Sequence, residues 1–214
     1  NGSLEYDGAN LVIADRGTYT ITLTLGSPDY TYTVERGSFD DRALFYTDGQ
    51  TLEITDPFEF TNGYAVAKFK NINSDGSSPS DMTFIDTDFP LFRLADIYLM
   101  YAEAAIQTGS HTSEAVEYVN LVRMRAFGEE SGNITSSDLT LEWILDERAR
   151  ELYWECHRRT DLIRHGKLTG GEYLWPWKGG VAEGTSIDEK FNLFPIPSSD
   201  LGANPNLVQN NAGY

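Results

Sequence analysis

The stretch that most constrains the fold is ILDERARELYWECHRRTDLIRHG, residues 144–166, because so many charges must be satisfied close to one another. On an α-helix, side chains three or four positions apart lie on one face and can pair. Acids and arginines recur at these spacings: Asp146–Arg150, Glu155–Arg159, Glu147–Arg150, Arg148–Glu151, Glu155–Arg158, Arg158–Asp161 and Asp161–Arg164. Each exposed pair contributes about 0.2–0.5 kcal/mol. The pattern predicts one long helix over residues 139–166.

Apolar residues on this segment give the predicted helix faces to pack. They are Ile144, Leu145, Leu152 and Leu162, with the rings of Trp143, Tyr153 and Trp154. We expect its arginines to run along aromatic surface and to reach loop carbonyls. The helix would then brace the long C-terminal coil, so substitution of Glu155 or Arg158 should reduce stability before it affects any function.

The same acids allow a catalytic alternative, in which two of Glu147, Glu151 and Glu155 form a glycosidase acid/base pair. That chemistry needs carboxyls about 5–9.5 Å apart across an open cleft. Carboxylates already matched by arginines on one helix seldom have this freedom, so the structural interpretation is favoured.

Metal and thiol chemistry find little support in this helix. His157 and His165 are eight positions apart, which does not match the H-E-x-x-H spacing of a zinc site. Cys156 is the single cysteine, so no internal disulfide can form. We interpret both histidines as packed or solvated residues.

Two shorter helices are predicted between residues 89 and 128. Asp88 is placed as the N-cap of the first, Pro90 lies near its first position, and Gly109 and Gly128 follow the two ends. Small residues suit a tetratricopeptide-like antiparallel pair: Ala102, Ala104, Ala105 and Ala115. One pair is too few for a solenoid. We therefore expect an apolar face that self-association or a partner covers.

The remaining segments are β or irregular. In GTYTITLTLGSPDYTYTVER, apolar residues and threonines alternate as in paired strands, and NLVI before it is a candidate third strand. Residues 37–88 suggest weak strands and long loops, and residues 167–214 an extended, ordered coil. The predicted fold class is mainly α with irregular loops, preceded by a small antiparallel β segment over residues 1–36.

Charge excludes some partners. The formal net charge is −17, and binding to phosphates requires a basic surface, so nucleic acid is excluded. An anionic bilayer would repel the chain, and no run approaches the roughly 18 apolar residues of a membrane span. Neutral ligands such as sugars remain open, as do cations.

Two loops carry candidate binding residues. EYLWPWKGG holds Tyr173, Trp175 and Trp177, and alternate aromatics in an extended segment project to one side, where flat rings can stack on sugars. The alternative is that they anchor the coil onto the helices. FIDTDFP holds Asp86 and Asp88, whose D-x-D spacing suits part of a calcium site. Calcium is the one cofactor that the sequence suggests.

Four motifs together resemble a known family. FPLFRLADIYLMYAEA, ILDERARELYWECHRRTDLIRHG, YLWPWKGG and NLFPIPSSDLGANPNLVQN, in this order, are similar to the C-terminal part of the SusD/RagB outer-membrane glycan-binding lipoproteins, over about residues 38–214. The resemblance implies tetratricopeptide-like helix pairs, glycan binding at the cell surface, and partnership with a TonB-dependent transporter of the SusC type. It implies no catalysis.

The departures from that family also matter. Family members are commonly more than twice as long, and their N-terminal portion carries the export signal, the lipid-anchor cysteine and much of the glycan-binding surface. Cys156 stands where the family more often has a glycine-like residue. Residues 1–36 resemble instead the last strands of a SusE/SusF-type starch-binding module. The expected function is non-catalytic glycan binding; the alternatives are a glycan-degrading hydrolase and a structural remnant without its own ligand site.

Overall fold

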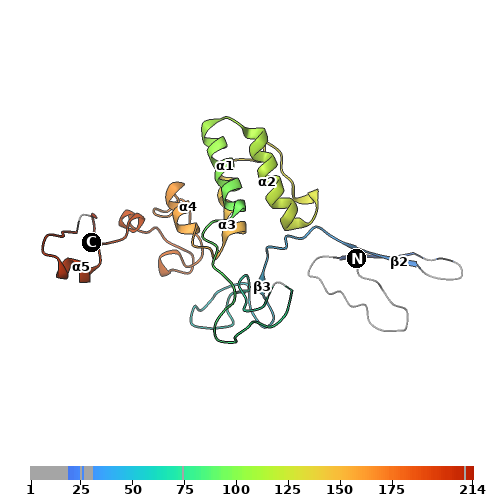
Figure 1. The fold of residues 1–214 in the computed structure, drawn as a ribbon, viewed down its shortest axis with the longest axis horizontal. Helices are drawn as coiled ribbons and strands as arrows, with labels where there is room; N and C mark the ends of the chain where they lie inside the picture. Colours follow the sequence, from blue (N-terminus) through green and yellow to red (C-terminus); the bar gives the residue numbers. More distant parts are fainter. Residues whose placement is uncertain (1–18, 25, 27–30, 74, 210) are drawn as a thin grey trace. The chain divides into compact units, whose positions relative to one another are not determined.

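A computed structural model describes residues 19–24, 26, 31–73, 75–209 and 211–214 (Figure 1). The chain divides into two compact units. The first unit joins Asn1–Leu44 with Phe89–Ile144, and the second joins Phe45–Asp88 with Leu145–Tyr214. Within the described residues, no helix combines the length and the apolar character needed to cross a bilayer. The predicted fold class, mainly α with small antiparallel strand pairs and irregular loops, is confirmed.

The first unit contains the predicted β-hairpin. Strand β1 (Tyr19–Thr24) pairs antiparallel with β2 (Thr31–Arg36), and Ile21 lies opposite Val34. The alternation of apolar residues and threonines therefore predicted these strands correctly. The candidate strand NLVI lies outside the described residues.

Helices α1 (Leu94–Thr108) and α2 (Thr112–Phe127) form the predicted pair, and they lie side by side in Figure 1. Both end as expected at a glycine with left-handed backbone, Gly109 at φ 65° and Gly128 at φ 71°. The predicted start is wrong. Helix α1 begins at Leu94 after an extended Arg93, not at Asp88. The residue before a proline avoids the helical region, so Phe89 and Pro90 belong to an extended lead.

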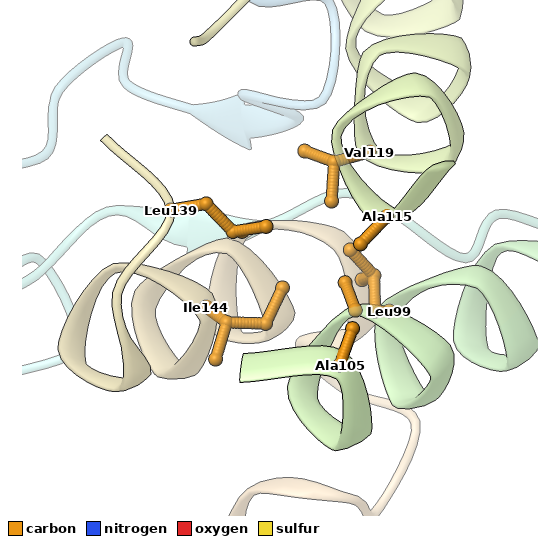
Figure 2. Close-up of a cluster of buried hydrophobic side chains, with 7 residues drawn as sticks. Leu99, Ala105, Ala115, Val119, Leu139 and Ile144 are labelled. Carbon is orange, nitrogen blue, oxygen red and sulfur yellow. The ribbon is translucent and has the colours of Figure 1, made fainter. Parts of the chain in front are cut away.

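The core of the first unit consists of small and branched side chains at the junction of three helices (Figure 2). Its members are Leu99, Ala102 and Ala105 of α1, Ala115 and Val119 of α2, Leu139, and Ile144 at the start of α3 (Leu141–Leu152). The three alanines leave room for the two helices to approach closely. Beside the core, the rings of Tyr98 and Tyr118 stack with centroids 4.7 Å apart.

The predicted long helix over residues 139–166 is wrong, because the structure breaks it in two. Helix α3 ends at Leu152 and α4 (Arg158–Arg164) follows after a turn. Two residues of that turn, Trp154 at φ 62° and Cys156 at φ 65°, have left-handed backbone. A right-handed helix cannot continue through such residues. The break lets the charged segment add partners that helical spacing does not predict.

The rest of the second unit is mostly irregular, as expected. Strands β3 (Phe45–Tyr46) and β4 (Ala65–Val66) form a two-residue antiparallel pair within long loops. After α4, the chain runs as an ordered coil interrupted by single turns of helix. These turns are η2 (Lys178–Gly180), η3 (Glu189–Asn192) and α5 (Ser198–Ala203).

Candidate functional site

A network of buried charges joins α3 to α4 in the second unit. The Arg148 Nε donates to Asp161 Oδ2 at 2.9 Å, and both side chains are 3 % exposed. The other carboxylate oxygen of Asp161 accepts from Arg164 at 2.8 Å. Asp161–Arg164 is one of the pairs that the helical spacing predicted; Arg148–Asp161 is not, because it joins residues 13 positions apart. Two helices separated by a turn can meet in this way, whereas one continuous helix could not.

A lysine from a distant loop holds the turn between these helices. The Lys68 Nζ donates to the backbone carbonyls of Glu151 at 2.8 Å and Tyr153 at 3.0 Å, and to the Glu155 carboxylate at 2.5 Å. It also lies 4.5 Å from the centroid of the Tyr153 ring, which stacks on Phe45 at 5.6 Å. We call Lys68 and its three acceptors the Lys68 clamp. Sequence spacing cannot reveal it, since Lys68 is more than 80 positions away from its acceptors.

The arginines of α4 brace the C-terminal coil, as the sequence predicted. Arg158 donates to the Leu145 carbonyl at 2.8 Å and to the Tyr173 hydroxyl at 2.7 Å. Arg159 donates to the Phe191 carbonyl at 2.5 Å, and its guanidinium lies 4.1 Å from the centroid of the Phe194 ring. Charged groups of this helix therefore bind backbone carbonyls and aromatic faces of the segment that follows it.

The three glutamates considered for catalysis are buried. Glu147, Glu151 and Glu155 are 0, 2 and 4 % exposed, and Glu147 accepts from Arg150 at 2.9 Å. A glycosidase pair has to face a cleft that admits a sugar and a water molecule. Three side chains this buried, of which Glu147 and Glu155 are ion-paired, fit a structural role better than an acid/base pair.

The aromatic segment lies close to the buried charges. Tyr173 and Trp175 have ring centroids 5.8 Å apart, and the Trp177 indole N–H donates to the Ile54 carbonyl at 3.0 Å. All three rings are half-buried. Beside them Lys178, only 2 % exposed, donates to the carbonyls of Gly170 and Tyr173. The structure thus gives each ring a role in anchoring the coil and leaves part of each ring open. Sugar contact by these residues stays a prediction.

The two candidate calcium ligands lie in an exposed loop. Asp86 accepts from the Ser80 hydroxyl at 2.5 Å and from the Ser80 backbone N–H at 2.6 Å. These hydrogen bonds, the hydroxyl's first, hold the pKa of Asp86 below its usual value. Asp88 is also exposed. In the part of the chain that the structure describes, no group of three or more His, Cys, Asp or Glu side chains is placed to hold a metal ion. A calcium site at Asp86 and Asp88 stays a prediction.

The sequence and the fold both match a known family. A model of the SusD family matches residues 22–214. The chain belongs to the SusD family. The match begins inside the β segment, earlier than the residue 38 that the motifs suggested.

Individual relatives agree with this assignment. The chain is 43 % identical over 181 residues to the starch-binding protein SusD of Bacteroides thetaiotaomicron, which covers 82 % of this chain and 31 % of the relative. It is 36 % identical to SusD-like protein P25 of Formosa agariphila, over 69 % of this chain and 28 % of that protein. The chain therefore spans about a third of the length of the curated SusD relatives it matches.

Solved structures share the fold. A SusD superfamily protein from Bacteroides thetaiotaomicron superposes with a TM-score of 0.56 at 26 % identity, covering 80 % of this chain and 37 % of the other. Surface glycan-binding protein A from Bacteroides uniformis gives a TM-score of 0.50 at 26 % identity, with the same coverage of both chains. The second of these relatives is named for glycan binding.

Within this SusD-family chain, the turn from Tyr153 to His157 differs most from the sequence interpretation. Trp154 was expected to supply a packing face, but it is 66 % exposed. Tyr153, its neighbour, does pack. Neither glycine nor proline marks a turn between residues 145 and 165, so the residues themselves held no signal for this difference; the one hint was the resemblance, which places a glycine-like residue at position 156.

Cys156 gives a direct test of the strain in this turn. It has φ 65° and its side chain is exposed. A left-handed non-glycine residue costs about 1–2 kcal/mol, while glycine adopts this conformation freely. We expect Cys156→Gly to raise the free energy of unfolding by about 0.5–1 kcal/mol in urea titrations, after its greater unfolded-state entropy is subtracted. Cys156→Ala, which keeps the Cβ atom, is the control and should bring no gain; an equal gain in both variants would contradict the strain.

Proposed function

We propose that this chain is a non-catalytic glycan-binding protein of the cell surface, acting with a TonB-dependent outer-membrane transporter of the SusC type. The observation that carries the proposal is membership of the SusD family, with a 43 % identical relative that is named for starch binding. Since the chain spans about a third of the length of that relative, both the ligand and the partners of this chain are proposals.

The buried charges support the non-catalytic part of the proposal. Glu147, Glu151 and Glu155 carry the acids that a hydrolase would need, and burial keeps all three from a substrate. Their role is then to fix α3, the turn and α4, which hold the C-terminal coil. Binding is left to exposed rings and loops.

For the glycan contact we propose the open faces of Tyr173, Trp175 and Trp177. Aromatic faces bind the apolar faces of sugar rings without any chemical step, and these three are held in place by Arg158, Lys178 and the Ile54 carbonyl. Preorganised side chains lose little entropy on binding. Calcium held by Asp86 and Asp88 is a second, separate proposal for the loop before α1.

The test follows binding and hydrolysis in one experiment. The chain is incubated with insoluble starch, cellulose, xylan and mannan, and both retention of the protein and release of reducing ends are measured. We expect retention on at least one glycan and no release. Release that disappears in Glu151→Gln would establish the hydrolase instead. Retention on none of them would leave a structural role without a ligand.

A further inference from the structure

Trp154 is a large apolar residue that the fold displays. All four tryptophans lie in the described part of the chain, and Trp154 is the one whose side chain is exposed, at 66 %. Its backbone is left-handed, at φ 62°. Both features oppose stability, because an exposed indole forgoes its burial and a left-handed non-glycine residue is strained.

The Lys68 clamp holds Trp154 in this position. Lys68 Nζ bonds the Tyr153 carbonyl on one side of the tryptophan and the Glu155 carboxylate on the other. Glu155 is 4 % exposed, its backbone N–H donates to the Leu152 carbonyl at 3.1 Å, and the Tyr153 ring packs on Phe45. With both neighbours directed inward and fixed, the residue between them is directed to solvent.

Residues that the surrounding contacts hold in a strained backbone conformation are characteristic of ligand sites. We propose that Trp154 is a sugar-stacking residue, which binds the apolar face of a neutral hexopyranose ring of a glycan. The inference rests on the proposed function and adds a contact outside the Tyr173–Trp177 segment. An indole on a fixed turn offers a flat apolar face at little entropic cost, and this is what a sugar ring requires.

Charge selects the class of sugar. The formal net charge of −17 repels uronic acids and sulfated sugars as they approach the chain, and so disfavours them. A neutral ring carries no such penalty. The alternative occupant, an apolar side chain of another protein, is an outcome of the test below.

The test compares two glycine variants of the same turn. Trp154→Gly removes the ring and relieves the strain, so the variant should fold and melt no lower than the wild type. Cys156→Gly relieves strain two residues away and keeps the ring. Calorimetric titration uses maltoheptaose, cellohexaose, xylohexaose and mannohexaose, with oligogalacturonate as the anionic comparison. We expect the best neutral ligand to bind Trp154→Gly about three- to tenfold more weakly than it binds the wild type. Its affinity for Cys156→Gly should equal that for the wild type. Its affinity for Trp154→Tyr should lie between those for the wild type and Trp154→Gly.

Acrylamide quenching of tryptophan fluorescence supplies a readout of the indole itself. The bound neutral sugar should reduce quenching more in the wild type than in Trp154→Gly, because the variant keeps only the protection of Trp175 and Trp177. Equal affinity of Trp154→Gly and wild type, or an equal reduction of quenching in the two proteins, overturns the inference and leaves glycan binding in place, with Trp154 open to an apolar side chain of another protein. Binding of oligogalacturonate alone overturns the neutral class. Binding of no sugar at all overturns the proposed function as well.

Discussion

Asp161→Asn is expected to lower the free energy of unfolding by about 3 kcal/mol, among the largest effects available in this chain. The Asp161 carboxylate is 3 % exposed and accepts from Arg148 on one oxygen and from Arg164 on the other. Asparagine has nearly the same shape but no charge, and its amide NH₂ would face one of the guanidinium groups. Removing one member of a buried pair costs much more than the pair itself contributes, because the other charge stays in a poorly solvated place.

Urea unfolding followed by circular dichroism measures this loss. Asp146→Asn is the matched control, since Asp146 is an exposed acid on α3 and should change stability by less than about 0.5 kcal/mol. The double variant Arg148→Met, Asp161→Leu replaces the pair with apolar groups and should recover part of the loss. A loss below about 1 kcal/mol in Asp161→Asn would mean that the joint between α3 and α4 does not depend on this pair.

The sequence predicted those features of the fold that depend on neighbouring residues. Glycines after α1 and α2 mark their ends, because the left-handed conformation is a local property of glycine. The hairpin follows from alternation in the same way. The start of α1 was missed, since Asp88 is a plausible cap but Pro90 disfavours helical backbone at Phe89, and the helix begins only at Leu94.

The break at Trp154 could not be predicted from local signals. Each residue from Ile144 to Gly166 is compatible with a helix, and the charges pair well on one. The turn is favoured instead by Lys68, by the stacking of Tyr153 on Phe45 and by the pairing of Arg148 with Asp161, all of which join residues distant in sequence. Tertiary contacts of this kind override helix propensity, which contributes only tenths of a kcal/mol per residue.

In the candidate site, too, the sequence predicted contacts between neighbouring residues and missed those between distant ones. Glu147–Arg150 and Asp161–Arg164, three positions apart on their helices, form as the spacing predicts. Glu155 was predicted to pair with arginines of its own segment, and the structure adds Lys68, a residue from a loop, as a partner of its carboxylate. The brace predicted from the segment is present, with a lysine from a loop as one of its members.

Lys68→Met should lower the free energy of unfolding about as much as Asp161→Asn does, by roughly 3–4 kcal/mol. The methionine fills similar volume but donates to none of the three acceptors, so the buried Glu155 carboxylate loses the Lys68 cation and the Glu151 and Tyr153 carbonyls lose a donor. Lys70→Met, a change of an exposed lysine two residues later, is the control and should leave the melting temperature nearly unchanged.

The partner variant separates structure from function. Glu155→Gln should also lower the melting temperature, and Lys68→Met with Glu155→Gln should cost less than the sum of the two, by about 1–3 kcal/mol, because both remove the same ion pair. Additive losses would show that the Lys68 clamp is not the connection that holds the turn. If Glu155→Gln abolished glycan retention at an unchanged melting temperature, the carboxylate would be a functional group and not a brace. We expect the reverse order, with stability lost before glycan retention. The turn should loosen first, and the acrylamide accessibility of Trp154 should rise with it.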